Sequence, residues 1–155
     1  MKPELQDKLY EKYPALFGQK DLPMTQTAMC WGIDAGDGWY NIIDCLCSAI
    51  DEHVEQLKAQ QTKSGEPPDP DSYEIQFVQV KEKFGTLRAY LNYSDETLEA
   101  LVGMAARLSA RTCDQCGNPA KTASHHGWYQ TLCPTCAETY ARKTGIGMDP
   151  VEEDE

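Results

Sequence analysis

Cys113-Asp-Gln-Cys116 and Cys133-Pro-Thr-Cys136 are two C-x-x-C pairs separated by sixteen residues. Four thiolates are a ligand set that Zn²⁺ takes in structural sites, and a two-residue spacer lets both sulfurs of a pair converge on one ion. Gly117 follows the first pair, where the tight turn of a zinc knuckle needs a residue that tolerates positive φ. The four cysteines therefore predict one structural Zn²⁺ per chain, with no coordination position left open for catalysis.

Besides coincidence, the sequence allows two other interpretations of these cysteines. The pairs could form disulfides, or a single C-x-x-C could be redox-active. A redox motif needs only one pair, whereas here a second pair stands at the spacing of a zinc ribbon. We therefore expect residues 112–145 to form a zinc ribbon with four cysteine ligands.

The composition is strongly acidic. The chain has 14 Lys and Arg against 25 Asp and Glu, a formal net charge of −11, and four thiolates on one Zn²⁺ would add about two negative charges. This charge repels phosphate backbones and disfavours nucleic acid as a partner, while it suits a basic protein or simply a soluble acidic protein. The N-terminal residues are charged and no apolar run is long enough to span a membrane, so we expect a cytoplasmic protein.

Hydrophobic periodicity predicts the elements upstream of the cysteines. Helical spacing predicts a first helix that ends near Pro14 and a long core helix that begins at Trp39 and is capped by Asp37. Residues 73–84 and 86–93 alternate as a β-hairpin, and a third helix follows, capped by Ser94. Residues 62–72 contain three prolines and no apolar side chain, which predicts a mobile linker.

These patterns predict an α+β fold with three helices packed on a β-hairpin and a C-terminal four-cysteine zinc ribbon. The expected division is an α+β domain over 1–111, the ribbon over 112–145 and an acidic tail over 146–155. A short helix should follow Cys136 and stop at Gly145.

Three stretches together resemble a family of small, uncharacterised tailed-bacteriophage proteins. They are Asp37-Gly-Trp39, the hairpin text Val78-Gln-Val-Lys-Glu-Lys-Phe-Gly-Thr-Leu-Arg-Ala-Tyr90, and the terminal Cys113-x-x-Cys116-Gly with Trp128 and Thr131-Leu-Cys133-x-x-Cys136. Family members often carry a second glycine and an aromatic where this chain has Thr86 and Ala89. The resemblance implies a phage accessory protein in the host cytoplasm and supplies no activity.

His125 and His126 lie between the cysteine pairs and raise the hypothesis of an HNH-like nuclease. Only six residues separate His126 from Cys133, and none is Asn, so the hairpin, Asn loop and helix that such an enzyme needs do not fit. We expect no catalytic residues. Asp34 and Asp37 could form a carboxylate pair, but a glycine-rich turn followed by a helix cap explains both.

Three groups of residues are candidates for binding a partner. The outer face of the long helix is acidic, the hairpin carries basic residues of which Lys81 and Lys83 should share a face, and the ribbon has an aromatic that either contacts a partner or packs on the third helix. The candidates are Asp51, Glu52, Glu55, Lys81, Lys83, Arg88 and Trp128.

The sequence thus predicts a non-enzymatic, zinc-binding phage accessory protein that binds a host protein, to take over host machinery or to counter a defence. The alternatives are a zinc-ribbon protein that binds nucleic acid or regulates, and a degenerate HNH-like nuclease.

Overall fold

The computed structural model describes residues 1–65 and 73–150, apart from the side chain of Pro150. The helices are α1 (Pro3–Lys12), α2 (Tyr40–Ser64), α3 (Glu96–Ser109) and α4 (Pro134–Thr144), with the short 3₁₀ turns η1 (Met29–Trp31) and η2 (Asp37–Trp39). The strands are β1 (Ile33–Asp34), β2 (Phe77–Lys83), β3 (Thr86–Leu91), β4 (Lys121–His125), β5 (Trp128–Leu132) and β6 (Asp149–Pro150).

The α+β class is confirmed, and the architecture is richer than three helices on a hairpin. The predicted hairpin is β2–β3, and β1 adds to it in parallel with β2, which gives the sheet order β1-β2-β3. A two-residue strand carries too little periodicity to be recognised from sequence. A second sheet, β5-β4-β6, and the helix α4 make up the C-terminal part.

The β2–β3 hairpin has one face in the core and one face toward solvent. Phe84 and Gly85 form its two-residue turn with φ of 54° and 76°, the positive values typical of a type I′ turn. Val80, Leu87 and Ala89 are buried on one face and join a single core with the apolar sides of α1, α2 and α3. Alternation therefore leaves Lys81 and Arg88 on the other face.

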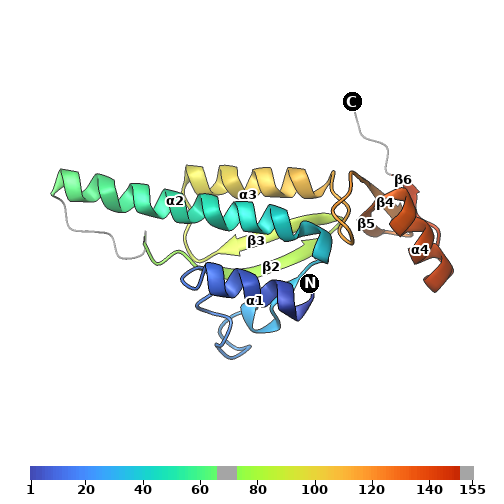
Figure 1. The fold of residues 1–155 in the computed structure, drawn as a ribbon, viewed down its shortest axis with the longest axis horizontal. Coiled ribbons are helices and arrows are strands. Elements are labelled where there is room, and N and C mark those ends of the chain that lie inside the picture. Colours follow the sequence, from blue (N-terminus) through green and yellow to red (C-terminus); the bar gives the residue numbers. More distant parts are fainter. Residues whose placement is uncertain (66–72, 151–155) are drawn as a thin grey trace.

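The long helix α2 buries Ile43, Leu46, Cys47, Ile50 and Val54. It runs beside α3 over the sheet (Figure 1). It ends at Gly65, whose φ of 71° is the left-handed conformation of a C-cap glycine. The predicted linker is wrong at its start, because α2 continues to Ser64; the rest of it, residues 66–72, lies outside the described residues.

Both predicted N-caps, Asp37 for α2 and Ser94 for α3, are wrong. Asp37 lies in η2, and its carboxylate accepts the backbone N–H of Lys2 at 2.8 Å and pairs with the Lys2 Nζ at 3.1 Å. The cap of α3 is Asp95, which accepts the N–H of Leu98 at 2.8 Å, one residue after the predicted Ser94. Local sequence offered several capping residues, and tertiary contacts selected among them.

The C-terminal part lies at one end of the helices and the first sheet (Figure 1). Residues of the predicted acidic tail take part in this structure, because Asp149 and Pro150 pair with Ser124 and Ala123 of β4. Residues 151–155 lie outside the described residues. Within the described ranges, no helix combines the length and apolar character needed to cross a bilayer.

Candidate metal centre

The first cysteine pair lies on a tight knuckle that precedes β4. The N–H of Gly117 donates to the carbonyl oxygen of Cys113 at 2.9 Å, and the N–H of Cys113 donates to the carbonyl oxygen of Asn118 at 2.7 Å. Gly117 has a φ of 79°, as the sequence predicted for this position. The backbone of the knuckle thus holds Cys113 and Cys116 on the same loop.

The second pair lies at the start of α4 and not on a second knuckle. Cys133 is the N-cap, Pro134 occupies the first turn, and the N–H of Ala137 donates to the carbonyl oxygen of Cys133 at 2.9 Å. The order is therefore knuckle, hairpin and helix, and the predicted ribbon is corrected in this respect. Pro134 favours this outcome because proline is well accommodated at the first position of a helix.

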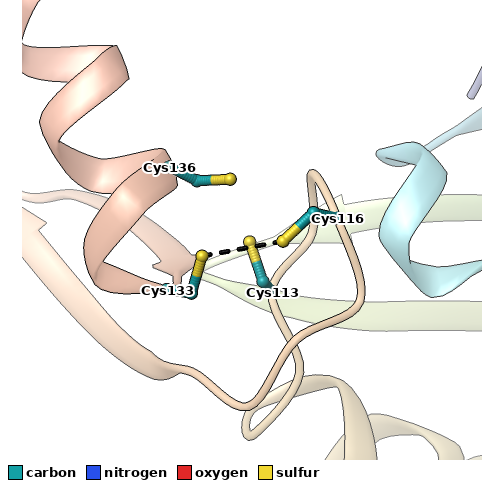
Figure 2. Close-up of side chains that lie close together, drawn as sticks. All are labelled: Cys113, Cys116, Cys133 and Cys136. Carbon is teal, nitrogen blue, oxygen red and sulfur yellow. Dashed lines mark hydrogen bonds between the residues drawn. The ribbon is translucent and has the colours of Figure 1, made fainter.

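The four sulfur atoms are close enough to bind one metal ion. The Sγ atoms of Cys113, Cys116, Cys133 and Cys136 all lie within 4.8 Å of one another, and Sγ of Cys116 is 3.6 Å from Sγ of Cys133. A tetrahedral ion with metal–sulfur bonds of about 2.3 Å separates its sulfurs by about 3.8 Å. Figure 2 shows the side chains converging from the knuckle and from the first turn of α4. The residues fit a tetrahedral, four-sulfur metal site.

The environment of the four thiols is uneven. Cys113 and Cys133 are buried, whereas Cys116 is exposed. The backbone N–H of Cys136 lowers the pKa of Cys133 to about 7, while burial and the neighbouring thiols raise the pKa of Cys136. A cation bound by these sulfurs would displace protons from the thiols. All seven cysteines are free of disulfides.

Two glycines before α2 let the knuckle pack directly on the backbone of the α+β part. The N–H of Gly36 donates to Oδ1 of Asp114 at 2.6 Å, and the N–H of Gly38 donates to the carbonyl oxygen of Asp114 at 2.8 Å. A Cβ at Gly36 would lie 2.0 Å from that carbonyl oxygen, so only glycine fits there without displacement. The knuckle that carries Cys113 and Cys116 therefore packs on the backbone of the stretch Gly36-Asp-Gly38.

Two further contacts attach the C-terminal part to the rest. Nε1 of buried Trp39 donates to the carbonyl oxygen of Thr112 at 2.7 Å. Oγ1 of Thr131, also buried, donates to the carbonyl oxygen of Gly85 at 2.6 Å, and the ring of Phe84 meets the ring of Tyr129 edge-on at 6.0 Å. The turn of the first hairpin thus rests on β5.

The two histidines between the cysteine pairs lie at the turn of the β4–β5 hairpin. His126 and Gly127 form its two central residues, with φ of 48° and 83°, and the rings of His125 and His126 are 4.3 Å apart. Within the described residues, the four cysteines are the one group of three or more His, Cys, Asp or Glu that could hold a metal. Over residues 1–65 and 73–149, the structure therefore brings no third metal-binding side chain to these histidines.

The predicted partner-binding residues lie on separate surfaces. Glu52 and Glu55 are exposed on α2, with Glu55 paired to Lys58 at 2.8 Å, and Asp51 is half-buried beside them. The basic residues lie on the face of the first sheet that turns away from the core, where Lys81 and Arg88 are direct cross-strand neighbours and Lys83 follows two residues later. The two groups do not form one site.

Trp128 lies on neither of those surfaces. Its side chain is 61% exposed at the tip of the β4–β5 hairpin, so the expectation that it packs on the third helix is wrong. The exposed ring remains a candidate for contact with a partner.

A cleft between the two parts brings the carboxylate pair considered from the sequence, Asp34 and Asp37, together with two further carboxylates. Its volume is about 500 Å³, and its walls include Asp34, Asp37, Glu82 and Asp114 as well as Met1 and Lys2. Burial, followed by repulsion from Asp114, raises the pKa of Glu82; burial, followed by repulsion from Asp34, raises the pKa of Asp114. The four carboxylates come from positions up to eighty residues apart, so no local motif connects them.

Comparison with protein-family models, with curated proteins and with solved structures finds no match for this chain. The chemistry of the site follows from its ligand set: a tetrahedral metal held by four cysteine sulfurs has no position left for water or substrate. Such a metal stabilises a fold and does not activate a reactant.

Proposed function

We propose that the four cysteines hold one Zn²⁺ as a structural ion. Tetrahedral four-sulfur sites select Zn²⁺ or iron, and a single ion of Zn²⁺ fits the sulfur spacing. The knuckle and the start of α4 have few apolar contacts between them: the buried members of their cluster are Cys113, Leu132 and Cys133. A metal therefore supplies the cross-link that so small a core lacks.

We further propose that the protein is a non-enzymatic phage accessory protein that binds a protein of the host. The observation that carries this proposal is the closed ligand set, because it leaves the metal no open position for catalysis and so agrees with a binding role. The resemblance to small phage proteins and the charge of −11 support a basic host protein as the partner. The exposed carboxylates Glu52 and Glu55 would meet that partner.

Affinity capture tests this proposal. The zinc-loaded chain is immobilised, exposed to host lysate, and the retained proteins are identified by mass spectrometry. We expect one host protein to be retained by the wild type and released as salt is raised, because exposed charges are screened. Wild-type chain that retains no host protein above a bead control contradicts the proposal.

A second candidate function rests on Trp128. An aromatic ring that is 61% exposed can stack on an unpaired base, and stacking tolerates any sequence. This function is recognition of single-stranded nucleic acid by the C-terminal part. Salt-dependent retention of an oligonucleotide, lost in Trp128→Ala, would support it. Metal-dependent cleavage lost on replacing His125 and His126 would instead support the degenerate nuclease.

A further inference from the structure

The strand β3 has an open edge. It is the last strand in the order β1-β2-β3, so only one of its sides is paired. Lys83 and Thr86 flank the two-residue turn as a hydrogen-bonded pair, and pairing alternates from there, which directs the backbone N–H and C=O of Leu87, Ala89 and Leu91 away from β2. These three residues determine what the edge can bind.

The helix α3 provides a hydrogen-bond partner for the backbone of this edge at one end only. Oγ of Ser109 accepts the N–H of Leu87 at 2.7 Å, which fixes the end of α3 against the strand. Among the residues that the structure describes, the outward N–H and C=O of Ala89 and Leu91 have no hydrogen-bond partner. An unpaired edge of this kind is a template for another strand.

A groove of about 420 Å³ lies between this edge and α3, which run near each other in Figure 1. One wall is β3 from Leu87 to Leu91, and the other is the side of α3 that carries Leu98, Val102, Gly103 and Ala106. The α3 wall consists of these apolar and small residues together with Glu99. The groove therefore combines an unpaired backbone edge with a mostly apolar wall that carries one carboxylate.

Gly103 leaves open space in the α3 wall of the groove. Glycine in the middle of a helix is less favourable than alanine, so a structural reason is expected for it. A Cβ at Gly103 would meet nothing within 4 Å, so no neighbour in the described chain requires a glycine here. Its place in the groove wall means that a bound segment could use the open space.

We infer that this groove binds an extended, mostly apolar segment of a partner protein, which adds as a strand to β3 and packs its side chains against α3. The inference rests on the proposed function of binding a protein, and it adds a second contact, in the groove beside α3, to the one proposed for the acidic face of α2. The unpaired donors and acceptors at Ala89 and Leu91 require a polypeptide backbone as the occupant. A second copy of the chain is disfavoured, because each copy carries a charge of −11.

Selection from a library of random nine-residue peptides displayed on phage supplies the probe. The most enriched sequence is synthesised with a fluorophore, and its affinity for the full zinc-loaded chain is measured by anisotropy. Gly103→Leu places a side chain in the groove wall, at a position where its Cβ meets nothing within 4 Å, and should weaken binding at least tenfold while the melting temperature stays equal or rises. Met104→Leu is the matched control, because Met104 is exposed on α3 and does not line the groove.

Amide hydrogen exchange gives a second readout. In the free chain, the amides of Ala89 and Leu91 should exchange faster than those of Arg88 and Tyr90, which point toward β2. Adding the peptide should slow Ala89 and Leu91 selectively. Protection of these two amides in free protein that increases with protein concentration would show a second copy in the groove and overturn the inference.

Two other results also overturn it: a library that yields no enriched peptide, and a peptide that binds Gly103→Leu as tightly as the wild type. Capture from host lysate distinguishes an error in assigning the groove as the binding site from an error in the proposed function of binding a host protein. If Gly103→Leu still retains the host protein, the groove is wrong and partner binding stands.

Discussion

Gly38 packs so closely on Cys113 that a Cβ at position 38 would lie 2.0 Å from the carbonyl oxygen of Cys113. The same Cβ would also lie 2.4 Å from the backbone nitrogen of Gly117. These neighbours are backbone atoms of the cysteine knuckle and cannot rotate away. The start of α2 and the knuckle therefore form one rigid contact through a residue that has no side chain.

Gly38→Ala should destabilise the protein by about 1–3 kcal/mol, the usual cost of inserting a group where no space exists. It should also weaken metal retention, because the knuckle must shift. Urea denaturation measures the first effect, and competition with a chelator measures the second. Gly103→Ala is the control: it lies in open space within a helix and should raise stability by about 1 kcal/mol. A variant at Gly38 as stable as the wild type would show that the knuckle is mobile.

Cys116→Ser should release the metal and unfold residues 112–145, because the ion links the knuckle to α4. Elemental analysis of purified protein should find one zinc per wild-type chain and a large loss in the variant. Cys45→Ser is the matched control, since Cys45 is exposed on α2 and lies outside the cluster. Zinc absent from the wild type, or fully retained by Cys116→Ser, contradicts the assignment.

Thr131→Val should cost about 1–3 kcal/mol, because it leaves the carbonyl oxygen of Gly85 buried without its donor. Thr122→Val removes only the 2.8 Å contact between the two threonine hydroxyls, so we expect a smaller loss. Thermal or urea unfolding of both variants tests this order. Equal costs would mean that the contact with Gly85 contributes little to joining the two parts.

Asp95 links α2 to the start of α3, and its contribution should depend on pH. Burial acts to raise the pKa of Asp95, but hydrogen bonds from His53 at 2.7 Å and from the N–H of Leu98 outweigh it and lower the pKa below 3.8. The folded state thus favours the carboxylate, so its stabilisation is present above the unfolded pKa and is lost as pH falls through the lower folded value. Asp95→Asn, which keeps the cap oxygen, should differ most from the wild type near neutral pH.

Unfolding measured from pH 7 downward checks this dependence. The difference in free energy of unfolding between the wild type and Asp95→Asn should shrink as the pH approaches and passes the ordinary Asp value of 3.8. Asp95→Ala removes the cap as well and should cost about 0.5–2 kcal/mol at neutral pH. A difference that stays constant over the whole range would contradict the assigned role of the charge.

Glu52→Lys combined with Glu55→Lys tests the acidic face of α2 directly. Both side chains are exposed, so the double reversal should change stability by less than about 1 kcal/mol. Capture of the host protein should weaken and depend less steeply on salt. The comparison variant is Trp128→Ala: if it abolishes capture and the acidic reversals do not, the C-terminal hairpin makes the contact.

Local sequence was sufficient for features that depend on neighbouring residues. The cysteine spacing predicted the cluster, the apolar stripe from Ile43 to Val54 predicted the buried side of α2, and Gly85 marked the turn between the strands. Each of these signals lies within one element. The cluster of four cysteines was predictable because each C-x-x-C spacing already brings two of its ligands together.

Only the tertiary structure decided how these elements meet. Asp37 binds Lys2 instead of capping α2, β1 joins the sheet beside Val80, and Gly38 receives the cysteine knuckle of a segment seventy-five residues later. Each contact joins residues that are distant in sequence, and its free energy depends on the positions of both partners. A single sequence shows where a small residue such as Gly38 leaves room for close packing. Which distant segment packs there is known only from the tertiary structure.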